Sequence, residues 1–246
     1  LFESEIKANP ITDLDLQKGG PSGYLFIACG TNTNIGAIYR VVDDGTSVVQ
    51  PIISGQPGWG RSSLAVAPSN EAVLYVMTAQ SQNLGGFGAQ SLRGLYLSTD
   101  SGNSFFVQID GTVTPTTAAQ KINQSLLTNP IIGLATECGQ GTSQSFNQGW
   151  YDNVIAVDPV NPARIWAGGI DLFRSDNSGQ SFGAAGYWWK ERGVDPTYHH
   201  ADQHAIVFHP QYDGTSNRIM FSGHDGGVDR IEWVGTKNYE DVVTIY

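Results

Sequence analysis

The chain has 246 residues, with 13 Lys and Arg against 23 Asp and Glu, so its formal net charge is −10. This charge, without any basic run that could follow a phosphate backbone, argues against nucleic acid and anionic membrane surfaces as partners. No apolar run approaches the roughly 20 residues that cross a bilayer, so the sequence predicts no membrane span.

Three stretches of the chain share one template. They read "GWGRSSLAVAPSNEAVLYVMT" (58–78), "GWYDNVIAVDPVNPARIWAGG" (149–169) and "ADQHAIVFHPQYDGTSNRIMFSG" (201–223). Each begins with a polar lead-in, continues through a short β-rich run, a proline and a polar turn, and ends in a second β-rich run. This order predicts a two-stranded hairpin three times over.

A third strand and a turn follow the first two hairpins, and a looser copy precedes the first. The three copies are "AIYRVVDDGTSVV" (37–49), "GLYLSTDSGNSFF" (94–106) and "IDLFRSDNSGQSF" (170–182). Aligned on the turn, the equivalent residues are Asp43, Asp100 and Asn177, and Gly45, Gly102 and Gly179. Glycine supplies the positive φ of a tight turn, and Asp and Ser side chains cap backbone N–H groups. We therefore expect these residues to be structural, with Phe105 and Phe182 packed between sheets.

One of these turns matches a known motif. "STDSGNSF" (98–105) fits S-x-D-x-G-x-S/T-F/W, the Asp-box or bacterial neuraminidase repeat, at every defined position from Ser98 onward. "SDNSGQSF" (175–182) keeps Ser175 but departs at the Asp position, and "VVDDGTSV" (41–48) loses the leading Ser and the aromatic residue. The chain resembles secreted Asp-box β-propellers, a group that includes sialidases, xyloglucanase-type endoglucanases and sortilin-type domains.

Repeat and resemblance together predict an all-β protein, a β-propeller of four-stranded antiparallel blades with Asp-box turns. We expect residues 1–246 to form one propeller segment, with blades at about 20–55, 61–110, 152–185 and 203–246 and an insertion at about 110–148. About four blades are fewer than most such propellers have. We therefore expect part of a larger ring, completed by another chain or absent here, with an unusually small ring as the alternative.

The geometry of such a blade predicts which end binds a ligand. The start of the innermost strand and the loop between the second and third strands lie at one end, and the Asp-box turn lies at the other. Counted back from the three prolines, Arg61, Asp152 and Gln203 are equivalent, which places "HHADQH" (199–204) at the mouth of the central channel. The residues expected to contact a ligand there are Asn34, Arg61, Tyr151, Trp188, Trp189, His200, His204 and His224.

Two kinds of chemistry fit this end of the blades. Glycoside hydrolysis needs two carboxylates that flank the scissile bond, and Asp152, Asp202 and Asp225 are the expected acids. His200, Asp202 and His204 alternate, so on a regular strand they would project to one side, as a metal site requires. The alternatives for these histidines are a polar cluster that contacts a ligand without metal, or a hydrogen-bonded structural role. Asp225, followed by two glycines, equally fits a turn cap.

Four tryptophans allow two interpretations. Adjacent Trp188 and Trp189 could form a stacking platform for sugar rings, whose apolar faces suit indoles, or wedge between neighbouring sheets. Trp59 and Trp150 occupy the same position of the repeat, so we expect both to be structural.

Enzyme signatures of the related families are missing from the sequence. The sialidase Phe/Tyr-Arg-Ile-Pro motif, arginine triad and Tyr-Glu pair are not found, nor is a nucleotide-binding signature. "TNIGAIYR" (33–40) resembles the xyloglucanase stretch T-D-I-G-G-A-Y-R, but Asn34 replaces its catalytic Asp. We therefore expect a binding or scaffold module for a glycan or another protein, without an organic cofactor. A glycoside hydrolase is the second interpretation, and a subunit that completes its ring with another polypeptide is the third.

The expected location follows from composition. Lysine is scarce while Gly, Ser, Thr, Asn and Gln abound, which is typical of secreted or periplasmic β proteins.

Overall fold

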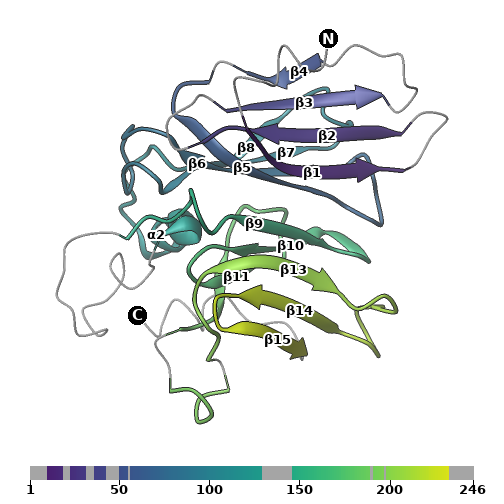
Figure 1. The fold of residues 1–246 in the computed structure, drawn as a ribbon, viewed down its shortest axis with the longest axis vertical. Coiled ribbons are helices and arrows are strands. Elements are labelled where there is room, and N and C mark those ends of the chain that lie inside the picture. Colours follow the sequence, from purple (N-terminus) through teal and green to yellow (C-terminus); the bar gives the residue numbers. More distant parts are fainter. Residues whose placement is uncertain are drawn as a thin grey trace.

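The computed structural model describes residues 10–18, 23–31, 36–42, 50–54, 56–128, 146–188, 191–196 and 198–232. Antiparallel strands dominate these residues and form four separate sheets (Figure 1). In every sheet, strands that are consecutive along the chain are hydrogen-bonded neighbours, so each sheet is a simple meander.

The strands alternate in direction through each sheet. The first sheet contains β1 (Ile11–Gln17), β2 (Tyr24–Cys29), β3 (Ala37–Val42) and β4 (Gln50–Ile53). The second contains β5 (Trp59–Val66), β6 (Leu74–Gln80), β7 (Leu92–Ser98) and β8 (Phe106–Asp110). The third contains β9 (Val154–Asp158), β10 (Asn161–Gly168), β11 (Leu172–Ser175) and β12 (Gly183–Gly186). The fourth contains, among the described residues, β13 (Gln203–Phe208), β14 (Ile219–His224) and β15 (Gly227–Glu232).

The sheets stack through their first strands. β1 packs against β5, β5 against β9, and β9 against β13, so the innermost strands of successive sheets are neighbours. Figure 1 shows the sheets following one another from the first, in purple, to the fourth, in yellow. This is the arrangement of blades around a central axis, and the predicted all-β propeller with four blades is confirmed.

Apolar side chains fill the space between neighbouring sheets. Phe26 and Ile38 of the first sheet pack on Trp59 and Val76 of the second. The larger cluster between the second and third sheets includes Tyr75, Met77, Leu95, Ile165 and Phe173, all at most 1 % exposed. Trp166, Leu172 and Met220 join the third sheet to the fourth, with Ile206 and Phe208 against them. Each such side chain contributes about 1.5–3 kcal/mol of stability when buried, so the interfaces between sheets hold the propeller together.

The first sheet begins earlier than expected. β1 starts at Ile11, whereas the sequence placed the first blade at about 20. Asp13 and Asp15 of β1 point toward the second sheet, where Asp13 Oδ2 accepts the Leu64 N–H at 2.7 Å and Asp15 Oδ2 accepts the Val66 N–H at 2.6 Å. Both N–H groups lie on β5, the edge strand of its sheet, so these carboxylates satisfy donors that the ladder leaves unpaired.

The predicted insertion contains a helix that contributes to the core. α2 (Ala118–Gln124) begins with a capping box between Thr117 and Gln120 and continues into the 3₁₀ turn η1 (Ser125–Leu127). Ile122, Leu126 and Leu127 from this segment are buried in the cluster between the second and third sheets. Residues 118–127 of the predicted insertion therefore seal the interface of two sheets. Residues 129–145 lie outside the described part of the chain.

The turns between third and fourth strands have matching hydrogen bonds. Ser98 Oγ accepts the Gly102 N–H at 2.8 Å, and Asp100 Oδ1 accepts the Ser104 N–H at 2.8 Å. In the third sheet, Ser175 Oγ accepts the Gly179 N–H at 2.9 Å, and Asn177 Oδ1 replaces the carboxylate as acceptor for the Ser181 N–H at 3.0 Å. Gly102 and Gly179 have φ values of 78° and 81°. The expected turn roles of these residues are thus seen in both sheets.

The aromatic residues that follow these two turns are both packed against the core, whereas the third predicted turn is not described. Phe182 is 2 % exposed in the main core, and Phe105 is partly buried against the cluster of the first two sheets. Asp43 and Gly45 lie outside the described residues, so the third turn stays a prediction.

The two end sheets lie at opposite ends of the stack (Figure 1). Leu14 and Leu16 of β1, whose side chains alternate with Asp13 and Asp15, are 52 % and 42 % exposed. Completion of the ring by another chain stays a prediction. Of the helices in the described part of the chain, none has the length and hydropathy that a membrane span needs.

Candidate functional site

The three predicted acids come together at the end of the sheets opposite the Asp100 and Asn177 turns. Asp152 lies two residues before β9, Asp202 directly before β13, and Asp225 in the two-residue turn between β14 and β15. The negative charges of Asp202 and Asp225 both act on the Asp152 carboxyl. We call Tyr151, Asp152, Asp202, His204 and Asp225 the rim cluster.

Asp152 and Asp202 form a carboxyl pair. Gln148 Nε2 lies 3.1 Å from Asp202 Oδ1 and 3.4 Å from Asp152 Oδ2, and the two carboxyls are close enough for one to donate to the other when protonated. Asp152 is fully buried, and its Oδ1 has no hydrogen-bond partner among the described residues. Burial and the neighbouring Asp202 raise the pKa of Asp152 to about 8, so the pair holds a proton at neutral pH.

Asp225 is held by two donors and is ionised. Tyr151 Oη donates to Asp225 Oδ1 at 3.0 Å, and His204 Nε2 lies 2.7 Å from the same oxygen. These hydrogen bonds from His204 and Tyr151 lower the pKa of Asp225. The Tyr151 and His204 rings also pack edge to face at 4.8 Å, so the rim cluster ties the third sheet to the fourth.

Arg61 positions the chain that carries the rim cluster. It lies on β5, and its Nη1 donates to the carbonyl oxygens of Trp150 at 3.0 Å and Tyr151 at 2.7 Å. Arg61 and Trp150 also line a groove of about 380 Å³ together with Ile11, Thr12, Gly30 and Thr31. Arg61 thus lies at the expected end of the sheets, and one guanidinium nitrogen is already used to hold the 150–151 backbone.

Trp150 is the residue of this site that the sequence argument missed. Trp59, at the same repeat position, is 1 % exposed and packs on Tyr96 with ring centroids 4.8 Å apart, as a structural residue should. Trp150 instead is 51 % exposed, with its ring 5.5 Å from that of Tyr151. The expectation that Trp150 is structural is therefore wrong: Trp150 lines the groove, and its indole lies beside Tyr151 of the rim cluster.

The predicted metal trio is not brought together. Asp202 has a φ of 67°, and the pairing register of β13 shifts between Gln203 and Ala205, so the strand start is not regular. His204 consequently contacts Asp225, Asp202 pairs with Asp152, and His200 stacks on His224 with centroids 5.3 Å apart. The alternation that suggested a shared ion among His200, Asp202 and His204 fails because of this irregular backbone.

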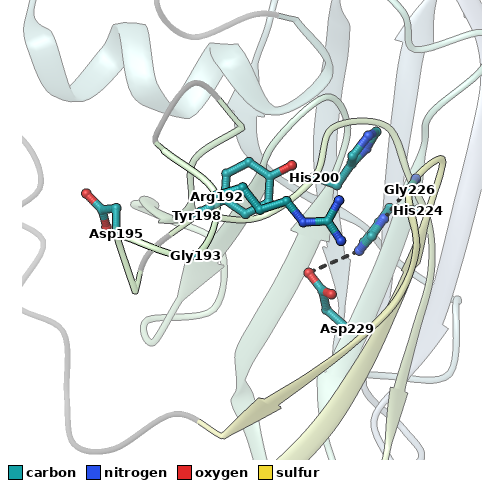
Figure 2. Close-up of a pocket in the computed structure, with 8 residues that line it drawn as sticks. All are labelled: Arg192, Gly193, Asp195, Tyr198, His200, His224, Gly226 and Asp229. Atoms are coloured by element: carbon teal, nitrogen blue, oxygen red, sulfur yellow. Dashed lines mark hydrogen bonds and ion pairs between the residues drawn. The ribbon is translucent and has the colours of Figure 1, made fainter.

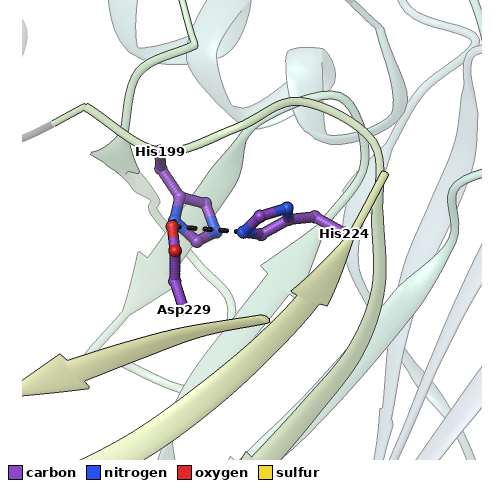
Figure 3. A group of neighbouring side chains, drawn as sticks. All are labelled: His199, His224 and Asp229. Carbon is purple, nitrogen blue, oxygen red and sulfur yellow. Dashed lines mark ion pairs between the residues drawn. The ribbon is translucent and has the colours of Figure 1, made fainter. Parts of the chain in front are cut away.

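A different set of ligand-type side chains converges beneath the rim. His199 Nδ1 lies 3.0 Å and His224 Nε2 3.1 Å from Asp229 Oδ2, and all three ligand atoms lie within 4.8 Å of one another (Figure 3). Burial lowers the pKa of His199, which favours its neutral imidazole form. We call these three residues the imidazole cluster; only His224 was among the residues expected to bind a ligand.

The imidazole cluster opens into a pocket of about 200 Å³. The residues that line it are Arg192, Gly193, Asp195, Tyr198, His200, His224, Gly226 and Asp229. Figure 2 shows the Arg192 side chain extending toward His224 and Asp229.

The tryptophan pair is described only in part. The backbone N–H of Trp188 donates to Asp171 Oδ1 at 3.2 Å, and Trp188 is 37 % exposed. Burial raises the pKa of Asp171 well above its usual range. Trp189 and Asn34 lie outside the described residues, so their expected contacts with a ligand stay predictions.

Comparison of the sequence with protein-family profiles and with curated proteins gives no match. Among solved structures, a GH74 enzyme from Niastella koreensis is similar, with a TM-score of 0.55 and 19 % identity over 92 % of this chain and 29 % of the enzyme. YCF48 from Cyanidioschyzon merolae has a TM-score of 0.41 and 9 % identity over 94 % of this chain and 58 % of that protein. YCF48 bound to D1 peptide has a TM-score of 0.26 and 14 % identity over 94 % and 80 %. This chain thus spans less than a third of the GH74 enzyme, and at this identity the likeness shows a shared propeller fold and nothing further.

Proposed function

We propose that the rim cluster and Trp150 bind a neutral glycan. The observation that carries this proposal is the position of Trp150 and Tyr151, two exposed aromatic rings in contact with each other beside the Asp225–His204 pair. Sugar rings have an apolar face that stacks on an indole and hydroxyl groups at their edges that need fixed hydrogen-bonding partners. The 380 Å³ groove in front of Trp150 supplies the concave surface.

Charge narrows the class of glycan. The rim cluster contains three carboxyl groups, and the whole chain has a formal charge of −10. A glycan with carboxylate or sulfate groups would be repelled, whereas the hydroxyl groups of a neutral glycan can donate to Asp225.

Affinity electrophoresis tests the proposal, because a neutral polysaccharide in the gel slows a protein that binds it. Gels that contain hydroxyethyl cellulose, galactomannan or starch are compared with a gel without polysaccharide. We expect retardation of the parent chain in at least one gel, and Trp150→Ala should weaken it by roughly tenfold or more, the usual effect of truncating an aromatic hot spot.

The matched control is Phe106→Ala. Phe106 is 57 % exposed on β8, the outer strand of the second sheet, so its removal changes an exposed aromatic residue far from the rim. Equal retardation of the parent, Trp150→Ala and Phe106→Ala would contradict the proposal. Retardation lost only in Trp150→Ala would support it.

Glycoside hydrolysis is a second candidate, favoured by the protonation states of the rim. The Asp152–Asp202 pair keeps a proton at neutral pH while Asp225 is ionised, which is the division of roles that an acid and a carboxylate partner need. Asp152 is fully buried, so Asp202, the partly exposed member of the pair, would pass the proton to the glycosidic oxygen.

Release of reducing ends from the polysaccharide that retards the chain tests this candidate. Asp202→Asn and Asp225→Asn should abolish release, whereas retardation in the gel, which also depends on Trp150, should be weakened but remain detectable. Unchanged hydrolysis in both variants would exclude the rim as a catalytic site, and the absence of release from any polysaccharide that binds would leave binding alone as the function.

A further inference from the structure

The geometry points to a metal site of the zinc type in the imidazole cluster, with His199, His224 and Asp229 as ligands. Two imidazoles and a carboxylate are a ligand set that zinc accepts, with a fourth position left for a small molecule. This inference does not depend on glycan binding, because none of its ligands belongs to the rim cluster.

The strand pairing of the fourth sheet brings the ligands to one face. Ser222 of β14 pairs with Asp229 of β15, so both side chains project on the same side of the sheet, and His224 follows on that side two residues later. His224 in turn pairs with Gln203 of β13. The chain before β13 places His199 over this pair, with His199 Nε2 2.8 Å from Gln203 Oε1.

The distances suit one shared ion. Zinc binds imidazole nitrogen and carboxylate oxygen at about 2.0–2.2 Å, so ligand atoms in a tetrahedral site lie roughly 3–4 Å apart. The two contacts to Asp229 Oδ2, at 3.0 Å from His199 Nδ1 and 3.1 Å from His224 Nε2, fall at the short end of this range (Figure 3). Small side-chain movements would open the cluster around an ion.

The hydrogen bonds of Gln203 orient His199 for a metal. Gln203 Nε2 donates to the His200 carbonyl at 2.6 Å and Ser222 Oγ donates to Gln203 Oε1 at 2.7 Å, which fixes the orientation of the amide. Gln203 Oε1 therefore accepts from His199 Nε2, and Nδ1 is the ring nitrogen that faces Asp229. An acceptor behind the ring is the usual second partner of a metal-bound histidine.

His224 supplies an independent observation. Its side chain is 3 % exposed, and its Nε2, 3.1 Å from Asp229 Oδ2, has no hydrogen-bond partner among the described residues. A buried nitrogen left without a hydrogen bond is costly unless something else satisfies it, and here it points at the other two ligands.

Metal binding has one structural consequence. His224 Nδ1 now accepts the Gly226 N–H at 3.1 Å, whereas coordination through Nε2 places the ring proton on Nδ1. The Gly226 amide must then turn away, within a turn whose next residue, Gly227, has a φ of 128°. His224 and Asp229 line the 200 Å³ pocket, where Arg192 would favour a small anion or a water as the fourth ligand of the ion (Figure 2).

Calorimetric titration of ZnCl₂ into chain treated with a chelator tests the inference. We expect one ion per chain and a higher melting temperature in its presence, because an ion that binds only the folded state stabilises it. Asp229→Asn should lower the affinity at least 100-fold; Asp229 is 43 % exposed, so the variant should fold. The control His204→Ala, which alters a histidine of the rim, should bind zinc as the parent does.

Measurements on the unaltered chain test the metal site even if the Asp229→Asn variant misfolds. X-ray absorption at the zinc edge of the loaded parent should show two imidazole ligands, and the amide resonance of Gly226 should move on loading. A parent chain that binds no zinc, or an Asp229→Asn variant that binds it equally well, would overturn the inference. Coordination without imidazole would overturn it too.

Discussion

His204 Nε2 lies 2.7 Å from Asp225 Oδ1, and this contact joins the start of β13 to the turn between β14 and β15. Because Tyr151 donates to the same carboxylate from the third sheet, Asp225 is the point at which two sheets meet at the rim. The charge and position of Asp225 therefore depend on both neighbours.

Removal of His204 should change the titration of Asp225. Hydrogen bonds from His204 and Tyr151 lower the pKa of Asp225, so their stabilising effect is present above the unfolded value of 3.8 and is lost as the pH falls through the lower folded value. In His204→Ala we expect the Asp225 midpoint to rise toward 3.8, as followed by the ¹³Cγ resonance. A midpoint that stays at its parent value would show that His204 does not hold the carboxylate.

Asp152 should make the fold less stable in alkali. Its folded pKa of about 8 lies above the unfolded value of 3.8, so its favourable contribution is complete below 3.8 and is lost as the pH rises through about 8. Asp152→Asn keeps a donor toward Asp202 and cannot ionise. At pH 9 its melting temperature should exceed that of the parent by a few degrees, since ~1 kcal/mol corresponds to about 2–4 °C in a chain of this size.

The control for this comparison is Glu232→Gln. Glu232 is 50 % exposed at the end of β15, so neutralising it removes one negative charge without touching the rim. Parallel stability profiles of Asp152→Asn and the parent between pH 6 and pH 9 would argue against a buried proton in the Asp152–Asp202 pair.

Most of the fold was predictable from the repeat, but strand β1 was not. The three hairpins and their turns can be recognised in the sequence because the proline, the polar turn and the glycine recur at fixed offsets. β1 precedes the repeated segments, and its Asp13 and Asp15 make Ile11–Gln17 look polar. Their partners are backbone N–H groups of β5, some 50 residues away, which no local pattern reveals.

The carboxylates of β1 should contribute measurably to the free energy of unfolding. Asp13→Ala leaves the Leu64 N–H without its acceptor at a partly buried position, which should lower the free energy of unfolding by about 1–3 kcal/mol. Asp13→Asn retains a carbonyl oxygen and should lose less. Urea denaturation of the two variants separates the outcomes, and equal loss in both would mean that the charge and not the hydrogen bond matters.

The turn after β7 should tolerate an amide but not a methyl group. Asp100→Asn copies the third sheet, where Asn177 makes the equivalent contacts, so its melting temperature should stay close to that of the parent. Gly102→Ala should destabilise by about 1 kcal/mol or more, because φ is 78° and the new Cβ would lie 2.9 Å from Ile52 Cδ1 and 3.1 Å from the Phe26 ring. Thermal melts of the pair test this, and a stable Gly102→Ala would show that the backbone can relax.

The site was only partly predictable for the same reason. Repeat position placed Asp152 and Asp202 at one end of the blades, and the structure brings both together with Asp225. Repeat position also made Trp150 equivalent to Trp59, yet Trp59 begins β5 and is buried, whereas Trp150 lies four residues before β9 and is exposed. Predicting Asp229 as a neighbour of His224 requires the strand register. With a two-residue turn at 225–226, His224 and Asp229 lie diagonally on one face of the sheet.

The proposed glycan binding depends on a contact between Trp150 and the glycan. The most direct measurement follows the indole N–H resonances of the chain while a neutral oligosaccharide from the retarding polysaccharide is added. The account predicts that the Trp150 resonance shifts saturably while that of Trp59, buried between the first two sheets, stays in place. An unmoved Trp150 resonance at oligosaccharide concentrations that saturate binding elsewhere would contradict it.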